Sequence, residues 1–208
     1  MRFLCLHGAG TSAEASTGGI IQELESKGHK FVFVDGRVNS KPEPEIEGIL
    51  DGPFYSHYPR DVYPGEDLAR AFEYTLNIME KQGPFDGVMG FSQGAALTCA
   101  LLAHHAKTNS TPLFKVAVFI CAAKPFESSG NKELVAEEGQ YPVSIPTTHI
   151  VGKQDPYYSS SMHLYGLCDP STAVFYDHGS KHHIPFDQKN TSAMTAAIEQ
   201  SIERAMKG

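Results

Sequence analysis

Short apolar runs alternate along this chain with longer segments of helical periodicity. The apolar runs fall at residues 3–6, 31–34, 85–90, 115–122, 147–151 and 172–176. They are short and rich in Val, Ile and Phe, which is typical of buried strands. Strands that are apolar throughout and separated by helices predict an α/β fold, with a mostly parallel central sheet of about six strands covered by helices on both faces.

The segments between these strands predict the covering helices. We expect helices over residues 13–27, 64–82, 92–106 and 187–207, and a further helix between the last two strands. In the second of these helices, the apolar positions that recur at steps of three or four predict one buried face. These positions are Leu68, Phe72, Leu76 and Met79.

Two segments interrupt the alternation. Residues 37–64 contain five prolines and several glycines, and residues 124–144 are a second irregular stretch with a short helical piece near 132–138. Long irregular segments in compact domains commonly form rims or lids of functional sites. A chain of 208 residues fits one domain. We therefore expect a single domain over 1–208 with rims at these two segments.

The strongest chemical signal is the run Gly90-Phe91-Ser92-Gln93-Gly94, which fits the pattern G-x-S-x-G. In a nucleophile elbow, this pattern forms a sharp turn between a strand and a helix and leaves the serine hydroxyl exposed above the sheet. Five letters with three fixed will recur by chance, so the context matters. Here a predicted strand precedes the run and a predicted helix follows it. Ser92 is therefore the candidate nucleophile, and a Gly-Ser turn without chemistry is the alternative.

A serine hydroxyl needs a base to accept its proton and an acid to orient that base. In this type of fold, the acid and then the histidine follow the serine along the chain. Asp155 lies in the turn after the strand at 147–151, at the same sheet edge as Ser92, and could also cap a helix beginning at Pro156. Asp177 ends the last strand, but a local turn role suits it better. Asp155 is the candidate acid.

Three histidines after the last strand compete for the role of base. His178 lies close to the strand end and suits a hydrogen-bonding role within its loop. His182 and His183 are adjacent, and periodicity does not separate them. The ten histidines of the chain show no spacing typical of metal ligands, so we expect no metal site.

Acyl transfer also requires hydrogen-bond donors for the developing oxyanion. One expected donor is the backbone N–H of Gln93, the residue after the nucleophile, and the other comes from the loop after an early strand. The small residues at positions 8–10 keep backbone amides accessible there, so Ala9, or else Gly10, is the second candidate. A dinucleotide-binding turn is excluded because G-x-G-x-x-G is not completed: Ala13 stands where the third glycine would be.

The chain resembles the fungal serine hydrolase family, which is related to the human ovarian-cancer-associated serine hydrolase and to the thioesterase that releases the lovastatin polyketide. The resemblance rests on the runs at 4–8, 52–56, 83–96 and 182–185. The family pattern of His, a variable residue, an aliphatic residue and Pro implies that His182 is the base and His183 the variable position. It also supports Ser92 and Asp155. Ser180-Lys181 stands where the family usually has two glycines.

Charge and cysteine content restrict the partners. The formal net charge is −7 and no basic stripe is present, which disfavours nucleic acid and anionic membranes as partners. The four cysteines lack metal or redox spacing, and three of them lie in apolar runs or in an apparent helix, so we expect free thiols and a cytoplasmic location.

Together these observations predict a serine hydrolase, a carboxylesterase or thioesterase, that needs no cofactor and forms an acyl-Ser92 intermediate. The substrate that the resemblance implies is a small to medium acyl ester or thioester, including a polyketide linked to an acyl carrier protein of its synthase. Aromatic residues of the irregular segments are candidates for the acyl pocket, or else plug the space beneath long loops: Phe54, Tyr55, Tyr58 and Phe126. Two alternatives remain, namely acyl transfer or carbon–carbon bond hydrolysis on the same triad, and non-catalytic binding of a small molecule.

Overall fold

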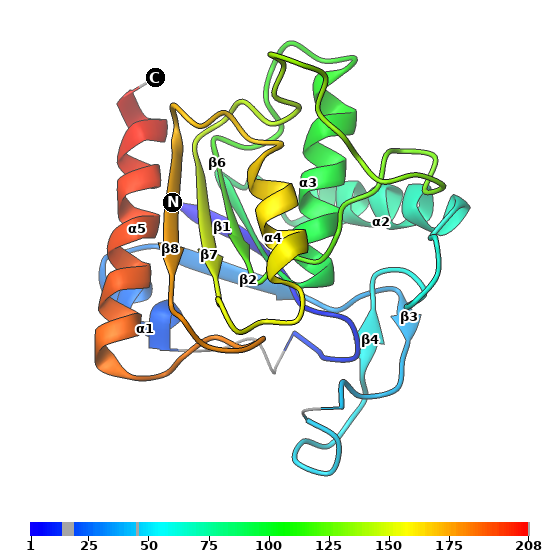
Figure 1. Cartoon of the computed structure of the whole chain (residues 1–208), viewed down its shortest axis with the longest axis horizontal. Helices are drawn as coiled ribbons and strands as arrows, with labels where there is room; N and C mark the ends of the chain where they lie inside the picture. Colours follow the sequence, from blue (N-terminus) through cyan, green and yellow to red (C-terminus); the bar gives the residue numbers. More distant parts are fainter. Residues whose placement is uncertain (14–18, 45, 208) are drawn as a thin grey trace.

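A six-stranded parallel sheet forms the centre of the protein (Figure 1). The computed structural model describes residues 1–13, 19–44 and 46–207. The strands are β1 (Arg2–Leu6), β2 (Lys30–Val34), β5 (Gly87–Phe91), β6 (Val116–Ile120), β7 (Thr147–Val151) and β8 (Ala173–Asp177). Their order is β2-β1-β5-β6-β7-β8, and every neighbouring pair is parallel. The predicted fold class is confirmed.

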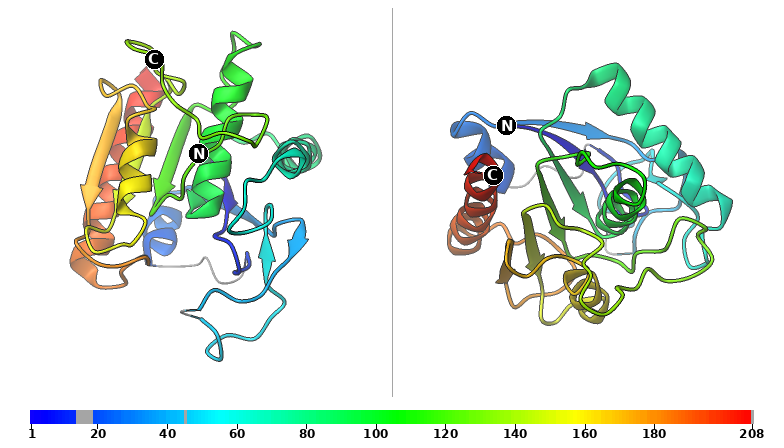
Figure 2. Two further views of the ribbon diagram at one scale, coloured as in Figure 1. Left: turned by 45° about the vertical axis from the view of Figure 1, so that its right-hand side comes forward. Right: turned by 90° about the horizontal axis from the view of Figure 1, so that it is seen from above.

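Helices cover both faces of this sheet, as Figures 1 and 2 show. One face carries α1 (Gly19–Ser26) and α5 (Gln188–Lys207), which pack against each other. The other face carries α2 (Glu66–Gln82), α3 (Gln93–Ala106) and α4 (Tyr158–Tyr165). The helix expected over residues 13–27 is therefore described from Gly19 onward, and its expected residues 14–18 lie outside the described part of the chain.

The core consists of two layers of side chains, one on each face of the sheet. Within β1, Leu4 and Leu6 join the cluster beneath α2, α3 and α4, whereas Phe3 and Cys5 join the cluster beneath α1 and α5. This division follows from the two-residue period of a strand, which sends successive side chains to opposite faces. Because both faces are covered, β5 and β6, at the middle of the sheet, have no polar side chain.

Two local expectations were wrong. In α2, Leu76 is 40% exposed, because the buried stripe is centred on Leu68 and Thr75 and leaves Leu76 at its edge. Residues 132–138 form no helix. The backbone there pairs instead with residues 125–127, through the bonds Glu127 N–H to Lys132 O (3.0 Å) and Leu134 N–H to Pro125 O (3.0 Å).

The irregular segment at 37–64 contains two short strands, β3 (Val38–Asn39) and β4 (Tyr55–Ser56), paired antiparallel outside the main sheet. The sheet order places β2 on one side of β1 and β6 on the far side of β5. Loops leaving β1 and β5 therefore diverge, which opens a crevice at the carboxyl ends of these two strands. Among the described residues, the helices are too short or too polar to cross a bilayer.

Candidate active site

Ser92 lies at the turn between β5 and α3, with a backbone φ of 51°. This left-handed conformation is rare for a residue with a side chain and is sterically costly. Two glycines permit the turn. A Cβ on Gly90 would come within 2.5 Å of the backbone nitrogen of Ala95, and a Cβ on Gly94 would come within 2.2 Å of the carbonyl oxygen of Leu6. The spacing of the elbow motif therefore reflects close approach of backbone to backbone.

A continuous chain of hydrogen bonds joins Ser92, His182 and Asp155. The Ser92 hydroxyl donates to His182 Nε2 at 3.0 Å, and His182 Nδ1–H donates to Asp155 Oδ2 at 2.8 Å. The side chain of Asp155 is fully buried, and that of His182 is 9% exposed. This arrangement fixes the imidazole with Nε2 as the acceptor, which is the tautomer that a base for the serine requires.

Asp155 is held by the turn that follows β7. Its Oδ1 accepts the backbone N–H of Tyr157 at 2.7 Å. The helix expected from Pro156 begins instead at Tyr158 with Tyr157 as its N-cap, so Asp155 holds the turn before the helix and does not cap it. Asp177 points elsewhere, because its Oδ1 accepts the backbone N–H groups of Lys153 and Gly179 at 3.0 and 2.7 Å. Asp177 thus ties the loop after β8 to the loop after β7.

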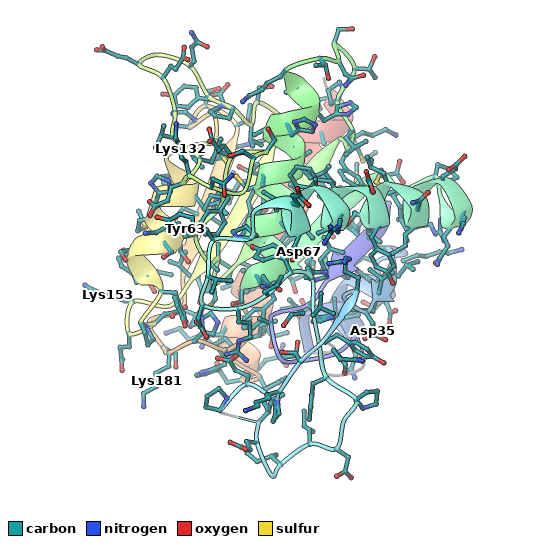
Figure 3. The ribbon with its side chains drawn as sticks, turned by 90° about the vertical axis from the view of Figure 1, so that its right-hand side faces the viewer. Asp35, Tyr63, Asp67, Lys132, Lys153 and Lys181 are labelled. Atoms are coloured by element: carbon teal, nitrogen blue, oxygen red, sulfur yellow. The ribbon has the colours of Figure 1, made fainter. Side chains whose placement is uncertain are left out.

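The other two histidines of the last loop do not contact Ser92. His178 is buried, and its Nδ1 accepts the backbone N–H of Ser180 at 3.2 Å. His183 is exposed, with Nε2 lying 3.2 Å from the Ser180 hydroxyl. Figure 3 marks the two neighbouring loops by Lys153, after β7, and Lys181, after β8. The Ser180-Lys181 departure from the family pattern is therefore compatible with His182 reaching the serine.

Cys121, at the end of β6, is a neighbour of the triad that sequence reasoning missed. Burial, with Asp155 as the nearest charge, raises the pKa of its thiol. Ligand atoms of Cys121, Asp155 and His182 lie within 4.8 Å of one another, the one such group of potential metal ligands within the described residues. Asp155 and His182 form a hydrogen bond with each other, and this bond accounts for the orientation of the two side chains without a metal ion.

The two expected oxyanion donors lie on separate elements beside Ser92. Within the described part of the chain, no protein group accepts the backbone N–H of Ala9 or of Gln93. Gly10 is not available, because its N–H donates to Tyr55 O at 2.8 Å and to the Ser56 hydroxyl at 3.2 Å. The geometry thus favours Ala9 over Gly10. Gln93 also stands at the start of α3, where the positive end of the helix dipole favours negative charge.

Two cavities meet at Ser92, and Ala9 and Glu43 also border both of them. The first has a volume of about 370 Å³ and is mainly apolar. Its walls come from strand ends, from the segment at 37–64 and from the last loop: Cys5, Phe33, Met89, Ile120, Ile46, Leu50 and Ile184. The second measures about 450 Å³ and includes charged side chains, with Arg60, Asp61, Lys124 and Glu133 on its walls.

Of the four aromatic residues expected in the acyl pocket, two line a cavity and two do not. Tyr58 and Phe126 line the second cavity. Phe54 and Tyr55 line neither cavity, which corrects that expectation. The Phe54 carbonyl accepts the N–H of Ser40 at 2.9 Å, and the Tyr55 carbonyl accepts the N–H of Gly10 at 2.8 Å. These two residues therefore hold the surrounding loops in place. The apolar cavity was missed because the periodicity of its strand residues is the same as that of ordinary core residues.

Comparisons with known proteins identify the family of the chain. Residues 1–194 match the family model described as Serine hydrolase (FSH1). Esterase FPY3 of Fusarium mangiferae is 37% identical over 223 residues, covering 100% of both chains. Hydrolase phiM of Talaromyces stipitatus is 31% identical over 220 residues, covering 96% of this chain and 87% of that protein.

Solved structures share the fold at much lower identity. A carboxylesterase from Mesorhizobium loti has a TM-score of 0.65 at 15% identity, covering 94% of this chain and 86% of that one. SOBER1 of Arabidopsis thaliana has a TM-score of 0.61 at 18% identity, covering 97% of this chain and 99% of that one. The family match spans most of the chain and includes the elbow, Asp155 and His182. The chain therefore belongs to the serine hydrolase (FSH1) family.

Proposed function

We propose that this serine hydrolase cleaves an ester or thioester of a small to medium acyl chain through an acyl-Ser92 intermediate. The observation that carries the proposal is the hydrogen-bonded chain Ser92–His182–Asp155 on a strained elbow between two cavities. In the first half-reaction, His182 Nε2 takes the hydroxyl proton while Ser92 Oγ attacks the carbonyl carbon. The charge that develops on the carbonyl oxygen is stabilised by the N–H groups of Ala9 and Gln93.

The proton on His182 then passes to the departing alcohol or thiol as its bond to the acyl carbon breaks. In the second half-reaction, His182 takes a proton from water, and the hydroxide oxygen attacks the acyl carbon. The second tetrahedral intermediate collapses to the acid, and His182 returns the proton to Ser92 Oγ. Asp155 holds the imidazole in the required tautomer and stabilises it while it is charged.

The two cavities suit the two parts of such a substrate. The apolar cavity, at about 370 Å³, lies within the size range of sites that bind small ligands, and it suits a hydrocarbon acyl chain. The second cavity carries charged side chains and suits a polar leaving group. We extend the proposal to an acyl group, such as a polyketide, delivered as a thioester on the prosthetic arm of a carrier protein. The amides of that arm can form hydrogen bonds with the charged side chains on the walls of the second cavity.

Covalent labelling tests the proposed nucleophile. A fluorophosphonate probe should add to Ser92 in the folded protein, and the adduct should be located by peptide mass spectrometry. Ser92→Ala should abolish labelling and lower kcat by a factor on the order of 10⁶. The matched control is Ser110→Ala, which alters an exposed serine after α3 and should keep wild-type turnover. Turnover of Ser92→Ala close to wild type would reject the mechanism.

Intact-mass measurement tests the substrate class. The same acyl group should be offered as an oxygen ester, as a free thioester and as a carrier-bound thioester, and the acyl-Ser92 adduct should be followed for each. A faster reaction from the carrier would support the extended proposal, and equal rates would reject it. Addition of a competing alcohol separates hydrolysis from acyl transfer. Hydrolysis gives mainly the free acid, whereas transfer gives mainly the ester of the added alcohol.

A further inference from the structure

The two candidate oxyanion donors are far apart in sequence, so something must fix their relative positions. The Ala9 N–H belongs to the loop after β1, and the Gln93 N–H begins α3. Oxyanion stabilisation depends on donors that are already aimed before the charge develops, and a small misplacement sacrifices much of the rate. Which side chains hold these donors is a question that rests on the proposed function, because only a developing oxyanion requires them.

The first contact acts on the peptide unit between Gly8 and Ala9. The Gly8 carbonyl oxygen accepts two hydrogen bonds, from His7 Nδ1–H at 2.6 Å and from the Thr11 hydroxyl at 2.7 Å. The Gly8 C=O and the Ala9 N–H share one planar trans peptide, in which they point in opposite directions. Holding the carbonyl on one side therefore directs the Ala9 N–H to the other side.

The protonation state of His7 follows from its other neighbour. The backbone N–H of Gly36 donates to His7 Nε2 at 2.8 Å, so Nε2 is the bare nitrogen and Nδ1 carries the proton. His7 is 1% exposed, and burial lowers its pKa, which favours this neutral form. Nδ1–H therefore donates to the Gly8 carbonyl at 2.6 Å, with the Thr11 hydroxyl oxygen as a second, longer partner at 3.1 Å.

His57 joins this loop to the start of α3. Its Nε2–H donates to the backbone carbonyl of His7 at 3.0 Å, and its own backbone N–H donates to Gln93 Oε1 at 2.8 Å. The Gln93 side chain also donates through Nε2 to the carbonyl of Tyr58 at 3.0 Å. One buried residue from the segment at 37–64 therefore contacts both elements that carry an oxyanion donor. Its side chain is enclosed, and burial lowers its pKa to about 3, so it remains neutral.

We propose that His57, His7 and Thr11 are positioning residues for the oxyanion site. His57 fixes the loop after β1 against the start of α3, while His7 and Thr11 orient the Gly8–Ala9 peptide. None of the three needs to contact the reacting atoms. Their effect is to keep the two N–H donors at a fixed separation during both tetrahedral steps.

Two matched pairs of variants test this proposal. His57→Gln keeps an N–H donor near the position of Nε2, whereas His57→Leu removes it. Thr11→Ser keeps the hydroxyl donor, whereas Thr11→Val keeps the shape and removes the donor. Thr11 is only partly buried, so its variants are expected to fold even where replacement of the enclosed His57 prevents folding. Kinetic constants should be measured with a short-chain ester, together with inhibition by an alkyl boronic acid that forms a tetrahedral adduct on Ser92.

We expect His57→Leu to lower kcat by about 100-fold and Thr11→Val by about tenfold, with KM within about twofold of wild type. Boronate affinity should fall by the same factors as kcat/KM, because the adduct uses the same donors. His57→Gln and Thr11→Ser should retain most of the wild-type kcat and most of the boronate affinity. Equal activity of Thr11→Val and Thr11→Ser, or a loss confined to KM, would overturn the proposal. A wild-type protein without esterase activity would instead overturn the proposed function.

Discussion

Acid should destabilise this protein through histidines that are buried in their neutral form, and His149 provides a test that is separate from the active site. His149 lies on β7, is 1% exposed, and packs between the rings of Phe119 and Tyr165 at 5.2 and 4.9 Å. Its Nε2 lies 2.9 Å from the Thr147 hydroxyl. Burial lowers the pKa of His149 from 6.5 to about 3.

The direction of the effect follows from this depressed pKa. Above pH 6.5, His149 is neutral in the folded and unfolded chain, so it makes no pH-dependent difference. As the pH falls from 6.5 towards 3, the unfolded chain binds a proton that the folded protein does not, and the free energy of unfolding decreases. A pH of 5.0 lies about 1.5 units below the ordinary histidine pKa of 6.5. At about 1.36 kcal/mol per unit, the free energy of unfolding is lower at pH 5.0 by about 2 kcal/mol. His57, with a similar pKa, should add a comparable loss.

Urea unfolding of wild type and His149→Gln at pH 7.5 and pH 5.0 measures this contribution. The substitution will change stability at both pH values, so the informative quantity is the loss between them. That loss should be smaller in His149→Gln than in wild type by about 2 kcal/mol. Ser110→Ala, at an exposed serine after α3, serves as the control and should follow wild type. An identical pH dependence in wild type and His149→Gln would refute the reasoning.

Three further predictions concern the site and its support. Asp155→Asn should lower kcat by about 10⁴-fold while circular dichroism shows an unchanged fold, since the amide favours the wrong tautomer of the imidazole; a loss below tenfold would argue against the acid role. Gly94→Ala should lower the free energy of unfolding by about 3 kcal/mol in urea titrations, because its Cβ would lie 2.2 Å from a β1 carbonyl oxygen; wild-type stability would contradict that close approach. Ile46→Phe should reduce the kcat/KM ratio of octanoyl to acetyl esters by about tenfold, since Ile46 lines the apolar cavity. Val62→Phe, in the second cavity, should leave that ratio unchanged, and an equal response of both variants would reject the assignment of the acyl chain.

Local sequence patterns were sufficient for much of this protein. The continuous apolar runs of β1, β5 and β6 are buried on both faces, so these central strands and their parallel arrangement could be predicted. The elbow was also predictable, because close approach of backbones at Gly90 and Gly94 excludes any side chain and leaves a visible pattern. The helix expected near 132–138 does not form, because contacts outside that segment decide its conformation. There, hydrogen bonds to residues 125–127 outweigh the local preference of the sequence.

The choice between neighbouring residues depended on the tertiary structure. Periodicity does not separate His182 from His183, and in the sequence only the family resemblance favoured His182. The path of the loop after β8 brings His182 Nε2 to 3.0 Å from Ser92 Oγ and leaves His183 exposed. Ala9 was the predicted donor with Gly10 as the alternative, and β4 decides between them because Tyr55 O accepts the Gly10 N–H. Hydrophobic pattern and steric exclusion act over a few residues and can be read from the sequence. Hydrogen bonds between segments that are distant in the chain depend on how loops cross the sheet edge, and only the folded chain determines those paths.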